Sequence, residues 1–118
     1  MTNLVILSGR LGADPEIRTT QAGKKIATVS VATSKPRRDS EGQMMKDEAG
    51  NVVENTEWHR VTMFNGLAGL AQNTLRKGMK VHLTGDTHYS TYEKDGETRY
   101  ATEIRVDQLD ILTWPKEG

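Results

Sequence analysis

The sequence predicts an all-β domain, organised as a small five-stranded barrel with one short helix. Segments rich in β-branched residues recur along most of the chain, only residues 66–77 have helical spacing, and Asp95-Gly96 is a strong signal for a two-residue hairpin. The 118 residues are enough for one domain with a modest core. No internal repeat or second domain is apparent in the sequence.

The first half of the chain predicts strands followed by a long connection. Residues 3–12 have the composition of a strand, which a turn or bulge interrupts before it resumes at Ile17. A hairpin connection at 21–24 leads to a strand over 25–34 that is rich in β-branched residues. Residues 35–55 hold Pro, Gly, Asn and many acidic residues without sustained periodicity, so we expect a long loop or a mobile hairpin there.

The second half predicts a strand, a helix and a long hairpin. The strand covers residues 56–64, and the helix over 66–77 ends at Gly78 after a cationic last turn. The stripe that we expect this helix to bury consists of Leu67, Leu70, Ala71 and Leu75. Strands over 79–93 and 97–112 complete the chain, and counting back from the turn between them pairs Tyr92 with Arg99. One helix after the third long strand matches a Greek-key barrel of the OB type, whose strand face and loops accept oligonucleotides, with an SH3-like barrel as the alternative.

Alternation along the strand 56–64 assigns its side chains to two faces. Val61 and Met63 share one face with His59, whereas Trp58, Arg60 and Phe64 share the other. If the first face points into the core, two aromatic residues flanking an arginine point outward together, which indicates a binding partner. A half-buried core contact is the alternative for the aromatic residues.

The formal net charge is zero, with 16 basic and 16 acidic residues, but the charge is unevenly distributed. Residues 1–38 carry a surplus of five positive charges, and residues 39–57 carry a surplus of five negative ones. A basic groove can therefore coexist with a neutral total, although a solvated charged surface would have the same composition.

Several classes of protein are excluded by what the sequence lacks. It has no cysteine, no apolar run near the roughly 18 residues of a membrane span, and no signal-peptide pattern at its start. We expect a soluble cytoplasmic protein that does not bind membranes. No metal-protease, Walker A or nucleophile-elbow spacing occurs, so we expect no catalytic residue, metal or cofactor. The enzyme alternative would be a metal site formed by His82, His88 and the acidic hairpin tip at Glu93, Asp95 and Glu97.

Five segments spread over residues 3–112 carry a resemblance to a known family. They are VILSGRLGADPEIR at 5–18, ATS at 32–34, TEWHRV at 56–61, LRKG at 75–78 and RYATEI at 99–104. With these segments the chain resembles bacterial and phage single-stranded DNA-binding proteins. The resemblance implies an OB fold that binds and protects single-stranded DNA without sequence preference during replication, recombination and repair. It also implies a nucleoid-associated homotetramer of bacterial, plasmid or phage origin, with a dimer as the alternative.

The resemblance assigns roles to individual residues. It implies base stacking for Trp58, Phe64 and Tyr92, because an exposed ring can stack on any base. The expected phosphate contacts are Arg10, Lys35, Arg37, Arg38, Arg60, Lys77 and Arg99. For His59 the resemblance implies a packed position at a subunit interface, with a plain core position as the alternative. A tyrosine on a hairpin can also simply stabilise cross-strand pairing, and surface cations are often only solvated.

The chain departs from the family pattern in three places. Arg37 stands where relatives commonly have a tryptophan, and residues 88–91 read His-Tyr-Ser-Thr where relatives are often basic. We expect the binding domain to span residues 1–112, followed by a short extension at 113–118 without the family's acidic tip, whether trimmed or naturally absent. Tail-mediated recruitment of enzymes is therefore not expected. These departures keep open an alternative function, a dimeric OB module of the primosomal kind that works mainly through protein contacts.

Overall fold

A computed structural model describes residues 1–114 and confirms the predicted all-β architecture. Its elements are β1 (Val5–Leu11), β2 (Glu16–Thr19), β3 (Lys25–Pro36), β4 (Glu54–Phe64), α1 (Gly66–Thr74), β5 (Lys80–Lys94) and β6 (Glu97–Thr113). The predicted extension at 113–118 lies outside the described residues from position 115 onward. No helix in the described part of the chain is long and apolar enough to cross a membrane.

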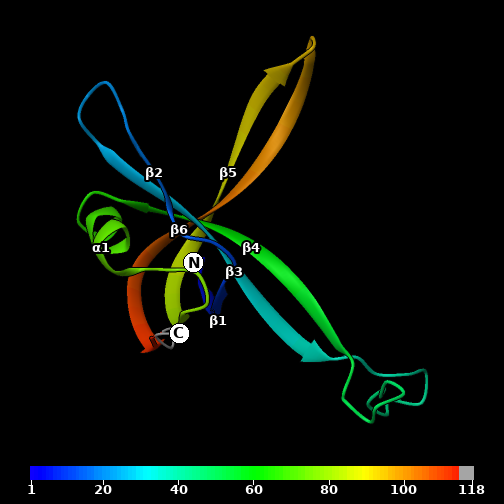
Figure 1. Cartoon of the computed structure of the whole chain (residues 1–118). Helices are drawn as coiled ribbons and strands as arrows, with labels where there is room; N and C mark the ends of the chain where they lie inside the picture. Colours follow the sequence, from blue (N-terminus) through cyan, green and yellow to red (C-terminus); the bar gives the residue numbers. More distant parts are fainter. Residues whose placement is uncertain (115–118) are drawn as a thin grey trace.

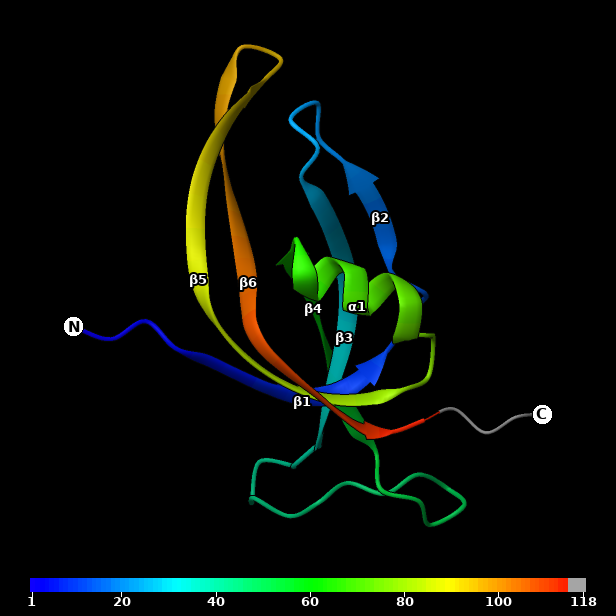
Figure 2. The ribbon, with the colours of Figure 1, turned by 90° about the vertical axis from the view of Figure 1, so that its left-hand side faces the viewer.

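The strands close into a barrel. They form one sheet in the order β1-β5-β6-β4-β3-β2, and the additional pairing of β1 with β3 closes it (Figures 1 and 2). All neighbouring strands are antiparallel except β4 and β6, which run parallel. Because β1 and β2 pair in turn along the same strand, β3, they act as one interrupted strand. The barrel therefore has five strands, as the OB topology requires.

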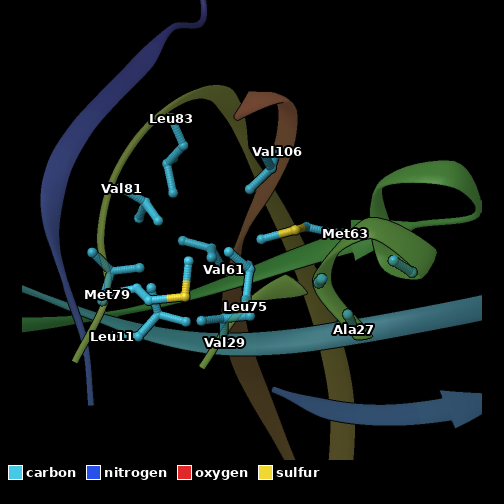
Figure 3. Packing of buried hydrophobic residues seen from close by; sticks show 13 residues of the cluster. Leu11, Ala27, Val29, Val61, Met63, Leu75, Met79, Val81, Leu83 and Val106 are labelled. Atoms are coloured by element: carbon cyan, nitrogen blue, oxygen red, sulfur yellow. The ribbon is translucent and has the colours of Figure 1, made fainter. Parts of the chain in front are cut away.

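The core lies inside the barrel and consists of aliphatic and methionine side chains (Figure 3). Val61 and Met63 of β4 are fully buried, as the alternation along this strand predicts. Helix α1 contributes Ala68 and Ala71 to the core and packs against β3 and β4. It ends at Thr74, earlier than expected, because the backbone turns extended at the buried Leu75.

One expectation for this helix is wrong. Leu70, placed on the buried stripe by its spacing, is 39% exposed. The helix is only nine residues long and packs against the barrel through Ala68 and Ala71. Its buried stripe is therefore narrower than that of a longer amphipathic helix, and Leu70 lies outside it.

Two long ribbons extend from the barrel (Figure 1). The ribbon of β5 and β6 turns at Asp95 and Gly96, whose positive φ angles of 54° and 79° fit the predicted two-residue hairpin. Its register places Tyr92 opposite Arg99, again as predicted. The second ribbon consists of β3 and β4, which stay paired out to Pro36 and Glu54. Both ribbons carry side chains well beyond the barrel.

Residues 37–53, at the end of the second ribbon, form two small hairpins rather than an irregular loop. Three backbone hydrogen bonds of 2.7 to 2.8 Å join Arg37, Met45 and Val53 in a ring, from Arg37 N to Val53 O, from Val53 N to Met45 O, and from Met45 N to Arg37 O. One hairpin lies between Arg37 and Met45, and its counterpart lies between Met45 and Val53. In each, an aspartate, Asp39 or Asp47, accepts two backbone N–H groups at its Oδ1. The segment is thus a short repeat with a period of eight residues, which the sequence analysis missed.

Candidate nucleic-acid interface

Trp58 lies on the outer face of the barrel, where β4 emerges from it. Its side chain is 63% exposed, and its partner across the strand pair is the small Ala32 of β3. Because Ala32 leaves space above β3, the indole reaches across that strand to Gly12, just beyond the end of β1. The ring is thus supported from below by the sheet while much of its surface stays open to solvent.

Two arginines share this outer face with Trp58. Arg60 is exposed, and alternation along β4 places it on the same side as Trp58. Arg10 pairs with Ala32, which in turn pairs with Trp58, so the three residues form one row across β1, β3 and β4. Lys80 of β5 extends this row because it pairs with Arg10. The structure therefore brings an exposed indole and several cations together on one surface.

Phe64 differs from the expectation of a freely exposed ring. It ends β4 on the same face as Trp58, but it is partly buried. The Lys24 ammonium lies 5.0 Å from the centre of the ring, and the Arg105 guanidinium carbon lies 5.3 Å from it. Both are cation–π distances. Neither cation was singled out by sequence reasoning as a site residue, because only the folded barrel brings the β2–β3 turn and β6 to the end of β4.

Tyr92 lies on the ribbon of β5 and β6 and is 49% exposed. By alternation it shares its ribbon face with Ser90, which lies opposite Ala101. Ser90 and Ala101 line a hollow together with Arg60, so this face of the ribbon is continuous with the outer face of β4. Trp58, Arg60 and Tyr92 therefore lie along one surface that bends from the barrel onto the ribbon.

The other predicted cations are more scattered. Alternation along β3 places Lys35 with Thr33, on the side away from Trp58, in a hollow that His59 also lines. Arg37 and Arg38 belong to the two hairpins of residues 37–53, where Arg38 donates to Gly42 O at 2.8 Å. The exposed Lys77 follows α1, and Arg99 pairs with Glu97 at 3.6 Å on the ribbon. The structure thus spreads these five cations over several elements instead of gathering them around Trp58.

His59 lies on the opposite face of β4 and is partly buried. Its Nε2 is 2.9 Å from Thr33 Oγ1, and it lines a hollow of about 540 Å³ together with Ile6 and Leu7 of β1. Ile6 is 58% exposed although it is a large aliphatic residue. Next to this hollow, residues 5–9 of β1 pair with β5 on one side only, which leaves an open strand edge.

No three His, Cys, Asp or Glu side chains within residues 1–114 gather closely enough to hold a metal ion. The surface around Trp58 instead offers one open aromatic ring, guanidinium groups and hydroxyls. These groups recognise flat apolar rings and anions, and a nucleic acid strand presents both.

Comparison with known proteins gives consistent results. The model of the single-strand binding protein family matches residues 2–112. Single-stranded DNA-binding proteins from Xylella fastidiosa and Xanthomonas campestris are each 42% identical to the chain over 117 residues, or 98% of it. The chain spans 66% and 63% of the length of these two relatives, slightly less than two thirds.

Solved structures show the same likeness. A Plasmodium falciparum SSB in complex with ssDNA superimposes with a TM-score of 0.78 at 28% identity, covering 96% of both chains. The wild-type single-stranded DNA binding protein from Thermus aquaticus gives a TM-score of 0.77 at 29% identity, covering 95% of this chain and 50% of that one.

Proposed function

Because this chain belongs to the single-strand binding protein family, we propose that it binds single-stranded DNA without sequence preference and protects it. One observation carries the proposal, the open indole of Trp58 on the same outer face as Arg10 and Arg60. Every base has a π-face, so an open ring accepts any sequence, while the guanidinium groups meet phosphates. Binding of this kind involves no covalent step.

The proposed path of the DNA follows the surface from the barrel to the ribbon. Trp58 and Phe64 are six residues apart on β4, which places them about 20 Å apart, so they hold separate bases. Arg60 lies between them, and Tyr92 continues the path on the ribbon face. A strand held along this path has its bases stacked on protein, so it cannot form hairpins and is shielded from nucleases. We assign the protein to replication, recombination and repair at the nucleoid on this basis.

The proposal includes assembly into a homotetramer, with a dimer as the alternative. An open strand edge pairs readily with another chain, and residues 5–9 of β1 present such an edge beside the exposed Ile6. His59, hydrogen-bonded to Thr33, lines the adjoining hollow and would be covered by the second copy. Several grooves in one particle raise the apparent affinity through effective concentration.

Tryptophan fluorescence tests the proposed function directly. The chain has two tryptophans, so a Trp114→Phe variant isolates the signal of Trp58. We would titrate it with a poly-dT oligonucleotide of about 35 nucleotides and with a matched duplex, at low and moderate salt. The proposal expects strong quenching by dT alone, with several chains per oligonucleotide.

Two other outcomes of this titration would contradict the proposal. Little response to either DNA would favour an OB module that works through protein contacts. An equal response to both would mean that the basic surface binds DNA and that the aromatic face does not.

A further inference from the structure

Phe64 is approached by two cations that come from opposite sides of β4. Lys24 belongs to the turn between β2 and β3, on the β3 side. Arg105 lies on β6, where it pairs with Thr62 of β4, on the other side. Their charged groups lie 5.0 and 5.3 Å from the ring centre. Two cations from segments far from Phe64 in the sequence therefore lie against its ring.

Both cations retain capacity to bind an anion. Within residues 1–114, the Lys24 ammonium has no carboxylate within salt-bridge distance. Arg105 is 46% exposed, and its Nε donates to Glu103 Oε2 at 3.2 Å. Its two terminal nitrogens make no hydrogen bond within residues 1–114, so they are available to an anion. Both side chains have long flexible stems. They can leave the ring without breaking a buried contact.

Two basic side chains on the neighbouring ribbon are already in contact with carboxylates. His88, on the face that carries Tyr92, contacts Asp86 at 3.0 Å. Arg99 on the same face contacts Glu97 at 3.6 Å. A DNA strand passing from β4 to the ribbon therefore relies on cations of the barrel, which include Arg18 and Arg60 in the hollow between them. Lys24 and Arg105 beside Phe64 add two further cations at the end of β4.

We propose that Lys24 and Arg105 bind the phosphates on either side of a base stacked on Phe64. The inference rests on the proposed binding of single-stranded DNA and adds a site to it. In the free protein both cations lie against the ring, and an exposed cation–π contact of this kind is weak. An incoming base stacks on the ring more strongly. The displaced cations then turn outward to the sugar–phosphate backbone, so stacking and phosphate binding occur together at one site.

The salt dependence of DNA binding tests directly whether Lys24 and Arg105 contact phosphates. We would determine the affinity for the same dT oligonucleotide at several salt concentrations, using the wild type, Lys24→Met, Arg105→Met and the double variant. Each lost phosphate contact on a single strand lowers the slope of log K against log salt by about 0.7, so the double variant should lose about 1.4. Thermal unfolding of each variant checks that the barrel is intact.

Lys25→Met is the matched control. Lys25 is the next residue and its loss changes the net charge equally, but its Nζ contacts Gln72 Oε1 of α1 at 2.6 Å. We expect it to keep the wild-type slope. A second control, Glu103→Gln, removes the acidic neighbour of Arg105 while keeping the cation, and it should not reduce the slope.

The outcomes separate this inference from the proposed function. If Trp58→Ala weakens binding while Lys24→Met and Arg105→Met keep the wild-type slope, the inference is wrong and the proposed function stands. An equal loss of slope in Lys25→Met would show a general effect of charge and would also overturn the inference. Tighter binding by the double variant would mean that the cations shield the ring instead of serving the DNA. If the wild type does not bind dT, both the inference and the proposed function are wrong.

Discussion

Gly12 supports the indole of Trp58 so closely that no larger residue fits between them. A Cβ atom on Gly12 would lie 2.3 Å from Cζ3 and 2.7 Å from Cη2 of the ring. Trp58 reaches this position by crossing β3 above Ala32. The glycine therefore fixes where the ring lies on the sheet, and with it the position that a base would take in the proposed stack.

Replacing Gly12 by valine should displace the indole and weaken binding of dT, because the ring would no longer lie against the sheet. We expect a loss of about 1 kcal/mol, the lower end of what one base stack contributes. Fluorescence titration measures the affinity, and acrylamide quenching of Trp58 in a Trp114→Phe background reports the new exposure of the ring.

A double-mutant cycle decides whether Gly12 acts through Trp58. In a Trp58→Ala background, Gly12→Val should cause no further loss of affinity, because the ring that it displaces is absent. A further loss of the same size would show that the glycine matters for another reason. Gly69→Ala is a neutral control, since nothing lies within 4 Å of a Cβ at that helix position.

Trp58→Ala should weaken binding to every sequence by a similar factor. Stacking uses the π-face that all bases share, and one stack contributes about 1–3 kcal/mol. Parallel titrations with dT, dC and dA oligonucleotides of one length measure the loss for each. A loss confined to one base would indicate hydrogen-bonded readout of that base and would contradict stacking.

Sequence periodicity alone predicted the faces of β4, because a strand places alternate residues on opposite sides whatever surrounds it. The hairpin at Asp95 and the register of Tyr92 followed in the same way from local turn chemistry. The surroundings of Phe64 could not be predicted in this way, because Lys24 and Arg105 reach the ring only through pairings between distant strands. Local patterns thus indicated which strand carries the proposed site, but the packing of its rings depends on contacts of long range.

Ile6→Lys should prevent assembly through the open edge of β1. Ile6 is 58% exposed in the single chain, so a lysine there costs the monomer little, whereas burying its charge between two copies would be unfavourable. Light scattering after size exclusion should show the wild type as an oligomer and the variant nearer the 13.1 kDa of one chain. Leu70→Lys, on the exposed side of α1, should leave the mass unchanged. An Ile6→Lys oligomer of wild-type mass would place the interface elsewhere.

Asp39 and Asp47 should each hold one hairpin of the segment 37–53 in shape. Each Oδ1 accepts two backbone N–H groups at 2.9 to 3.0 Å, and removing it leaves those groups to water. Hydrogen exchange of Asp39→Ala should therefore quicken at the amides of Glu41 and Gln43, while the second hairpin keeps its protection. Asp47→Ala is the reciprocal control, quickening exchange in its own hairpin only.

The two hairpins of residues 37–53 also lead to a prediction about thermal stability. Because the segment lies beyond the barrel, neither substitution should change the midpoint of thermal unfolding by more than a degree or two, as expected for loss of surface hydrogen bonds. If one substitution instead quickened exchange in both hairpins, the ring of bonds joining Arg37, Met45 and Val53 would be the cooperative unit. The two aspartates would then stabilise the segment jointly, and Arg37 would depend on both for its position.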